Sequence, residues 1–314
     1  MNINLENFTV IEDFGQNDIY ESLIAFNEAD NFKIFIKKTS KSVLQNEIKR
    51  KYFENELAVN KTFDHENIVI FLDKKDILND TYLLFEAVNG GNLSELFKKY
   101  QDKNKKPFPE EIVQNVIKQI ANALKYLHDR HIIYRNLGLE HAFLNFENEE
   151  DIPNFNLKDV KVKLGNFHLC KVLEENDLAH SFIGIPIYMD PNILFKSKEP
   201  EKISYEYKVD VWSLGTVCYE LLVGTTPFDG NNYDELIVNV KTGKYTIPKS
   251  LNLSTEAISF ITGMLQYDPN KRFDINQVLA HDFLNKDVKS FSHDGIDKLG
   301  EVNDKEIVLN ININ

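Results

Sequence analysis

Cysteine is scarce in this sequence. Only two cysteines, Cys170 and Cys218, occur in 314 residues, and their spacing indicates neither a disulfide framework nor a zinc site. His168 and Cys170 form a His-x-Cys pair that could supply two metal ligands, but no further ligands flank the pair in the sequence. We therefore predict no metal site at this pair.

The charge of the chain limits its partners. The formal net charge is −13 at pH 7, which argues against a general attraction to nucleic acid or to anionic membrane surfaces. No basic segment followed by an apolar stretch opens the chain, and no apolar run approaches membrane-spanning length. We expect an intracellular, cytoplasmic protein that has no signal peptide and binds neither nucleic acid nor membranes.

The first part of the chain has the pattern of a β-sheet. Residues 34–36 lie between lysines, and residues 81–85 form a compact apolar run. Both segments are rich in the branched and aromatic side chains that short strands favour. Residues 46–63, which lie between them, carry a mixed helical pattern. The sequence therefore predicts strands on either side of one helix.

After Gly90 the apolar residues recur at helical spacing. Pro109, Glu110 and Glu111 favour a helix start, and the apolar positions that follow are Ile112, Val113, Val116, Ile117, Ile120, Leu124 and Leu127. Residues 211–223 are apolar on nearly every face, which predicts a helix at the centre of a domain. Further helical patterns cover residues 256–265 and 275–279. The sequence therefore predicts a β-rich lobe followed by a larger helical lobe.

Two segments have a more polar composition. We interpret the acidic residues 147–151 as a solvated loop, and the residues after Leu284 as a tail rich in Asp, Asn, Ser and Lys. Residues 307–313 alternate as a strand does, and such a segment could join a sheet edge of this chain or of a partner. The alternative is a frayed terminus, which is the interpretation that we expect.

Six strings resemble the landmarks of eukaryotic protein kinases, in order and at the usual separations. They lie at residues 67–69 (after a helix that contains Glu56), 85–91, 127–133, 208–215, 268–272 and 281–284. The second resembles the hinge between two lobes, the third the approach to the catalytic loop, and the fourth the central helix of the larger lobe. The resemblance covers about residues 8–284, and the larger lobe is most similar to Ser/Thr kinases of the calmodulin-dependent or Unc-51-like kind.

This resemblance implies an α+β fold with a small β-rich N-lobe and a larger helical C-lobe. We expect the N-lobe at residues 1–89, the C-lobe at residues 90–284, and an acidic, Asn-rich tail at residues 285–314. A fold of this kind does not determine function, so the site has to be compared position by position.

The nucleotide site implied by the resemblance is partly retained. Lys37 has the position of the phosphate-binding lysine, Glu56 that of its partner, and Glu86 and Val88 lie in the hinge. The pair could bind the α- and β-phosphates of ATP, or it could simply lock a helix to the sheet. We favour the second interpretation, because a paired charge need not be functional.

Several bulky residues stand where the family leaves room for ATP. Only Gly15 of the family's G-x-G-x-x-G pattern is retained, with Asn17 and Tyr20 at the other two glycine positions, so we expect an ordinary β-turn. Phe35 should point into the cleft with Lys37, because strand side chains alternate. Together with Phe85, it is expected to fill adenine space.

The catalytic loop departs most from the family. Where H-R-D-L-K-x-x-N is usual, residues 134–141 place Asn136 at the base position, Gly138 at the lysine position and His141 at the metal-binding asparagine position. An amide cannot accept the substrate proton at neutral pH, and loss of a positioned base costs about 10²–10⁴-fold in rate. Imidazole is also a poor ligand for magnesium, which prefers oxygen.

The neighbouring segments show matching losses. Asn166 and His168 replace the Asp and Gly of D-F-G, and Ile185 replaces the threonine of G-T-P. The A-P-E segment reads Asp-Pro-Asn and ends at Asn192, so the glutamate that would pair with Arg272 is absent. We expect a buried Arg272 to need another partner.

These replacements lead us to predict that the chain is not an enzyme but a pseudokinase. It would act as a regulatory or scaffolding module for protein partners, with no cofactor, although ATP binding without magnesium is left open. The alternatives are an atypical or residual Ser/Thr kinase that binds ATP through Lys37, and a structural component of a larger assembly.

Regulation by phosphorylation is a further interpretation of the sequence. Ser181 lies in the expected activation loop, where another kinase could phosphorylate it, and Arg135 could hold the phosphate. We favour the simpler interpretation, in which Arg135 hydrogen-bonds local carbonyl groups.

Overall fold

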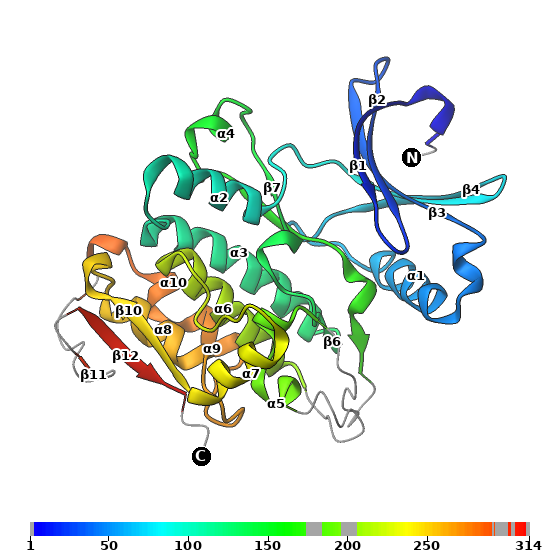
Figure 1. Ribbon diagram of the computed structural model, residues 1–314. Coiled ribbons are helices and arrows are strands. Elements are labelled where there is room, and N and C mark those ends of the chain that lie inside the picture. Colours follow the sequence, from blue (N-terminus) through cyan, green and yellow to red (C-terminus); the bar gives the residue numbers. More distant parts are fainter. Residues whose placement is uncertain are drawn as a thin grey trace.

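The computed structural model describes residues 3–173, 184–195, 206–290, 292, 301–302 and 305–311. An antiparallel sheet and one long helix form one end of the molecule, and most of the helices form the other end (Figure 1). This arrangement confirms the expected α+β, two-lobed kinase fold. Ser181, the expected phosphorylation site, lies outside the described residues.

The smaller lobe contains a five-stranded sheet with the order β1-β2-β3-β5-β4. Its strands are β1 (Thr9–Gln16), β2 (Glu21–Asn27), β3 (Phe32–Ser40), β4 (Phe71–Ile77) and β5 (Asp80–Glu86), and helix α1 (Glu47–Asn60) follows β3. Asn46 caps α1 by accepting hydrogen bonds from two backbone N–H groups of its first turn. The predicted strands at residues 34–36 and 81–85 and the helix between them are confirmed.

The larger lobe is built around two long helices, α3 (Glu110–His128) and α6 (Lys208–Val223). Nearly every side chain of α6 is buried, including Trp212, as its sequence predicted. Around these helices lie α2 (Leu93–Asn104), α4 (Asp151–Asn154), α5 (Pro191–Leu194), α7 (Tyr233–Thr242), α8 (Thr255–Met264), α9 (Ile275–Ala280) and α10 (Asp282–Asn285). Residues 147–150 of the expected loop 147–151 are exposed, whereas its last residue, Asp151, begins α4.

Short strand pairs position the segments between the lobes. Strand β6 (Ile132–Ile133) pairs with β9 (Lys171–Val172), and β7 (Ala142–Asn145) pairs with β8 (Lys161–Leu164). Residues 134–141 connect β6 to β7, and residues 165–170 connect β8 to β9. The two hairpin-like pairings therefore bring the segments around Asn136 and Asn166 together.

The C-terminal segment is a docked strand, so the expectation of a frayed terminus is wrong. Strand β12 (Glu306–Asn310) pairs along its whole length with β10 (Lys244–Pro248), and β11 (Glu301–Val302) pairs with its other edge. The alternating apolar residues Ile307, Leu309 and Ile311 are almost completely buried in the core of the larger lobe. Burial of this apolar face explains why the strand binds its own chain.

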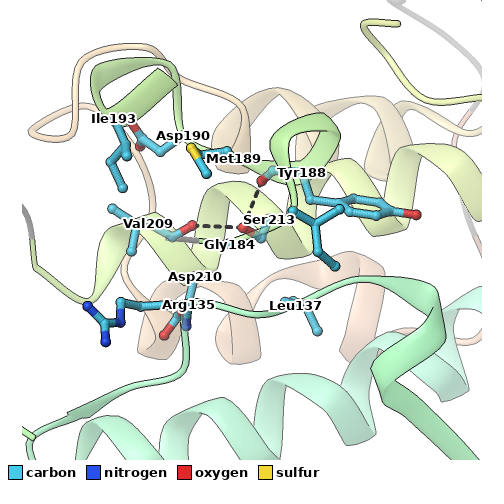
Figure 2. Close-up of a pocket in the computed structure, with 11 residues that line it drawn as sticks. Arg135, Leu137, Gly184, Tyr188, Met189, Asp190, Ile193, Val209, Asp210 and Ser213 are labelled. Atoms are coloured by element: carbon cyan, nitrogen blue, oxygen red, sulfur yellow. Dashed lines mark hydrogen bonds between the residues drawn. The ribbon is translucent and has the colours of Figure 1, made fainter. Parts of the chain in front are cut away.

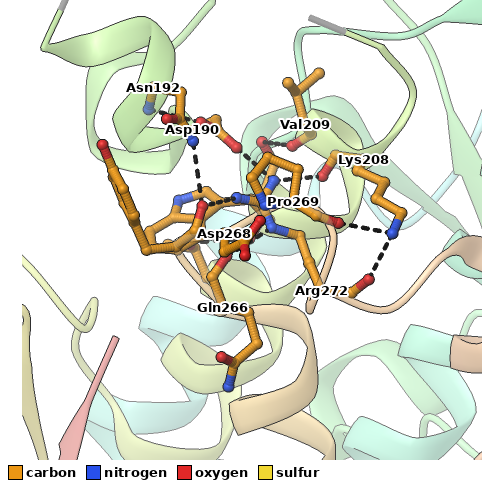
Figure 3. A network of polar contacts seen from close by, with 12 residues as sticks. Asp190, Asn192, Lys208, Val209, Gln266, Asp268, Pro269 and Arg272 are labelled. Carbon is orange, nitrogen blue, oxygen red and sulfur yellow. Dashed lines mark hydrogen bonds and ion pairs between the residues drawn. The ribbon is translucent and has the colours of Figure 1, made fainter. Parts of the chain in front are cut away.

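Arg272 finds the partner that the sequence did not reveal. It is almost completely buried and pairs with Asp190, two residues before the position of the missing glutamate (Figure 3). Its guanidinium also donates to the carbonyl oxygens of Lys208 at 2.8 Å and Gln266 at 2.9 Å. Asp190 in turn caps α5 by accepting a hydrogen bond from the N–H of Asn192 at 2.7 Å. The ion pair therefore joins α5, α6 and the segment before α9.

The described helices include no membrane-spanning candidate, because none combines the required length with sufficient apolarity.

We predict that Asp190→Asn lowers the free energy of unfolding by about 3–5 kcal/mol, because it leaves a buried guanidinium without its counter-charge. Asparagine keeps the capping function, so the change isolates the ion pair. Urea denaturation monitored by circular dichroism measures the effect. Glu54→Gln, which removes the exposed pair with Arg50, is the control and should cost less than about 1 kcal/mol.

We predict that Leu309→Ala costs about 2–5 kcal/mol of unfolding free energy, because the leucine side chain is only 1% exposed. Val308→Ala on the more exposed face of the same strand should cost clearly less. Thermal denaturation of both variants tests whether β12 is docked in solution. Equal, small effects of the two substitutions would contradict the structure.

Candidate functional site

A cleft of about 560 Å³ lies between the two lobes. Its walls include Phe35 and Lys37 from β3, Val88 from the connection between the lobes, and His141 and Asn166 from the segments after β6 and β8. Small-molecule sites in proteins commonly have volumes of about 300–1,000 Å³. The cleft is therefore large enough for a nucleotide-sized ligand.

The base of the cleft holds a buried ion pair between the sheet and α1. Lys37 Nζ lies 2.5 Å from Glu56 Oε1, and both residues are almost completely buried. Burial alone would raise the pKa of Glu56, but the charge and hydrogen bond of Lys37, together with contributions from His168 and Tyr20, outweigh burial and hold this pKa below its ordinary value. Lys37 Nζ also donates to Asn166 Oδ1 at 2.9 Å. The expected partners Lys37 and Glu56 thus meet, and Asn166 joins them.

Tyr20 covers the ammonium group of Lys37. The turn before it is ordinary, as expected, because Asn17 Oδ1 accepts from the N–H groups of Ile19 at 2.9 Å and Tyr20 at 2.8 Å. The Tyr20 ring is buried beside Phe53, with its centroid 5.1 Å from Lys37 Nζ. Burial raises the pKa of Tyr20, so its hydroxyl stays protonated. We had expected bulk at this position but not a contact with Lys37.

The two cleft phenylalanines form a wall and leave the cleft open. Phe35 is half-buried, with its ring centroid 6.5 Å from that of Phe85 and 6.3 Å from that of Phe14. Phe85 is buried and packs against Phe71 at 5.5 Å. Phe35 and Lys37 share the cleft face, as strand alternation predicted. A space of about 560 Å³ remains beside these rings, and the expectation that they take up adenine space stays a prediction.

The two hinge residues have different surroundings. The carboxylate of Glu86 accepts hydrogen bonds from Lys163 Nζ at 2.7 Å and from the N–H of Ile70 at 2.8 Å, so it is engaged within the fold. Val88 lines the cleft, and its backbone makes no hydrogen bond to the backbone of any other described residue. The peptide groups of Val88 are therefore free to contact a ligand.

Asp210 of α6 holds the loop that follows β6. Its carboxylate accepts hydrogen bonds from the N–H groups of Tyr134 at 2.9 Å and Arg135 at 2.8 Å, and from His128 Nε2 at 2.9 Å. Arg135 has a left-handed φ of 63°, and its guanidinium donates to the carbonyl oxygens of Leu169 at 2.7 Å and Cys170 at 3.3 Å. Arg135 thus bonds local carbonyl groups, as we expected.

Asn136, His141 and Asn166 lie together beside the ion pair. Asn136 is 3% exposed, and its Nδ2 donates to the backbone oxygen of Asn166 at 3.2 Å. His141 Nδ1 lies 2.6 Å from the backbone oxygen of Asn136, which can only accept, so Nδ1 carries the proton. Burial lowers the pKa of His141, which favours a neutral ring with an unprotonated Nε2. Asn166 has a left-handed φ of 59°, a conformation that asparagine tolerates well.

These side chains do not suit a magnesium ion. Magnesium prefers hard oxygen ligands, usually carboxylates, in near-octahedral geometry. At this place the chain offers two neutral amides and an imidazole, and one amide oxygen already accepts a hydrogen bond from Lys37. In the part of the chain that the structure describes, no group of three or more His, Cys, Asp or Glu side chains could hold a metal ion.

A side chain at Gly138 would require the neighbouring side chains to move. A Cβ atom built on Gly138 would lie 2.8 Å from Glu140 Oε2 and 2.8 Å from Ile185 Cδ1. Ile185 thus makes an apolar contact with this loop at the position where the family's threonine would make a hydrogen bond through its hydroxyl. A small cavity of about 20 Å³ is lined by Ile185, Leu137 and Tyr188, among other residues, and Figure 2 shows Leu137 and Tyr188 in this lining.

The segment with Ile185 is held by other hydrogen bonds. Ser213 Oγ donates to the backbone oxygen of Tyr188 at 2.8 Å (Figure 2), and Tyr188 Oη donates to Glu220 Oε2 at 2.7 Å. Burial raises the pKa of Glu220 to about 7, with the Glu140 charge adding to the effect and the Tyr188 hydrogen bond opposing it. Glu140 thus places an acidic group beside Gly138, and Glu220 is connected to the same place through Tyr188, neither of which the sequence revealed.

His168 packs against α1, and its Nδ1 atom has no hydrogen-bond partner. Its ring lies 6.1 Å from that of Tyr52, its Nδ1 is buried without a hydrogen bond, and Asn55 Nδ2 donates to its backbone oxygen at 3.1 Å. Burial lowers the pKa of His168 to about 4, although the negative charge of Glu56 partly opposes this.

This environment predicts a loss of stability in acid. In the unfolded chain His168 takes up a proton near pH 6.5, whereas in the folded chain it does so only near pH 4. The stability that depends on a neutral His168 is therefore fully present above pH 6.5 and is lost as the pH falls towards 4. Between pH 7.5 and 5 the cost is about 2 kcal/mol. His168→Gln should reduce the loss by that amount in urea denaturation at the two pH values. An unchanged pH dependence would contradict the assignment.

Comparison with known proteins identifies the family. The protein kinase domain model matches residues 8–284. The probable serine/threonine-protein kinase nek3 of Dictyostelium discoideum is 28% identical over 90% of this chain and 24% of its own length. The cell cycle serine/threonine-protein kinase CDC5/MSD2 of Saccharomyces cerevisiae is 30% identical over 80% of this chain and 33% of its own length.

A third relative, the serine/threonine-protein kinase ATG1 of Eremothecium gossypii, is 28% identical over 91% of this chain and 32% of its own length. The chain thus spans a third or less of these three relatives. Because the relatives are named as serine/threonine-protein kinases, the expectation that this chain is not an enzyme is contradicted. With a family model that matches nearly the whole described fold, the chain belongs to the protein kinase domain family.

Proposed function

We propose that this chain is an atypical serine/threonine protein kinase that binds ATP in the cleft through Lys37. The main observation in support is the buried pair of Lys37 and Glu56, 2.5 Å apart, at the base of an open cleft. Keeping a lysine buried at this place requires a counter-charge, which α1 supplies. The pair thereby holds a fixed positive charge where phosphates would lie in a kinase.

The cleft also offers contacts for the rest of a nucleotide. Val88 contributes backbone groups without backbone partners among the described residues, and Phe35 contributes an aromatic face. Such a mixture of apolar walls and a few placed polar groups is typical of small-molecule sites. Adenine would lie between these residues, with its phosphates towards Lys37.

Phosphoryl transfer demands little covalent chemistry from the protein. The bond between the γ-phosphorus and the bridging oxygen breaks, a new bond forms to the serine or threonine oxygen, ADP leaves, and the hydroxyl proton passes to water. The transition state is loose, so positioning and charge stabilisation contribute most of the catalysis. In this chain Lys37 would supply the charge, and Asn136 could orient the hydroxyl but not accept its proton.

We therefore expect a slow enzyme. Loss of a positioned base costs about 10²–10⁴-fold, and loss of carboxylate metal ligands adds to it. We further propose an intracellular, cytoplasmic location and protein substrates. The two cysteines, buried as free thiols, support a reducing compartment.

Nucleotide binding and phosphoryl transfer can be tested separately. At 100 times its dissociation constant, ATP should raise the free energy of unfolding by about 2.7 kcal/mol, measured as a thermal shift. Lys37→Met should abolish the shift relative to the variant's own melting temperature. Lys33→Met, on the same strand but exposed, is the matched control and should retain it.

Transfer is measured with radiolabelled ATP and a generic protein substrate over long incubations. The expected result is weak labelling of serine or threonine that disappears in Lys37→Met and persists in Lys33→Met. Labelling that does not depend on Lys37 would point to a contaminating kinase. ATP binding with no Lys37-dependent transfer would overturn the proposed catalysis.

A further inference from the structure

The positions that hold the metal in the family carry no carboxylate in this chain. Asn136 and Asn166 stand at the two aspartate positions, and His141 stands at the asparagine position. His141 and Asn166 line the cleft, and the Asn166 side chain accepts a hydrogen bond from Lys37. The buried Asn136 is hydrogen-bonded to both, because its Nδ2 donates to the Asn166 backbone oxygen and its own backbone oxygen accepts from His141. This donor set does not fit magnesium.

The same replacements change the charge that a nucleotide would meet. A pair of carboxylates repels a triphosphate unless a cation lies between them, because like charges a few ångströms apart interact strongly at low dielectric. Two neutral amides remove this repulsion. Of the other carboxylates near the cleft, Glu56 is paired with Lys37 at 2.5 Å and Glu86 with Lys163 at 2.7 Å, whereas Glu12, Glu95 and Glu140 also line the cleft.

The orientation of the Asn166 amide leaves a hydrogen-bond donor for an anionic ligand. Its Oδ1 accepts a hydrogen bond from Lys37 Nζ at 2.9 Å, so its Nδ2, a donor, is the group left for a ligand. Asn166 lines the cleft. An anionic oxygen placed beside Lys37 could therefore receive hydrogen bonds from an ammonium group and from an amide, which are the kinds of contact that proteins use to bind phosphate.

We propose that this cleft binds the triphosphate of ATP without a divalent cation, with Lys37 and the Asn166 amide taking the place of the metal. The inference rests on the proposed ATP binding and adds the chemical form of the ligand, the free nucleotide in place of its magnesium complex. Tyr20 covers Lys37 with its ring centroid 5.1 Å from Nζ, so the entering phosphate displaces this ring in either form.

The test compares ATP binding by titration calorimetry in EDTA and in excess magnesium chloride. The natural chain should bind ATP in EDTA at least as tightly as in magnesium. Asn166→Asp restores a carboxylate that can still accept from Lys37. It should weaken binding in EDTA by about tenfold or more, with recovery in magnesium.

Asn276→Asp is the matched control, because it makes the same substitution at an exposed position of α9, which does not line the cleft. It should not create a requirement for magnesium. Binding by the natural chain only when magnesium is present would overturn the inference and leave ATP binding intact. Absence of binding in both conditions would instead overturn the proposed ATP binding itself. Thermal melts without nucleotide establish that each variant is folded.

Discussion

The carboxylate of Asp210 is the contact on which the site depends most. It is 1% exposed within the central helix α6 and accepts hydrogen bonds from two successive backbone N–H groups of the loop after β6 and from His128. A buried carboxylate of this kind is stable only when its hydrogen bonds are complete. Because Arg135 has a left-handed backbone there, the chain turns at this point and brings Asn136 under the cleft.

The side chains of the site still make hydrogen bonds within the fold, although several positions that carry a charge in the family are neutral in this chain. Asn166 accepts from Lys37, and His141 donates to the Asn136 backbone. Asp190 replaces a glutamate two residues away as the partner of Arg272. Neutral groups and displaced carboxylates thus preserve the frame around a cleft whose electrostatics differ from those of a magnesium-dependent kinase.

Periodicity and the kinase landmarks predicted the helices, the sheet and the pairing of Lys37 with Glu56, because these depend on patterns along the chain. Whether the C-terminal strand pairs with this chain depends on an available strand edge at β10, which no local sequence pattern reveals. The contact between Tyr20 and Lys37 and the open space beside Phe35 depend on side-chain conformations. The use of Asp190 by Arg272 was equally hidden, since it depends on how α5 is placed against the segment before α9. Membership of the family corrected the expectation that the chain is not an enzyme, which had rested on missing groups alone.

The docked strand β12 has a consequence for how the protein is made. Its partner β10 emerges from the ribosome about 60 residues earlier, and pairings so distant in sequence form late. Until β12 is synthesised, Tyr245 and Ile247 of β10 lie beside an unpaired strand edge with apolar surface exposed. Such an edge is prone to pair with other chains. The larger lobe therefore passes through an aggregation-prone stage during synthesis, which ends when the strand closes over it.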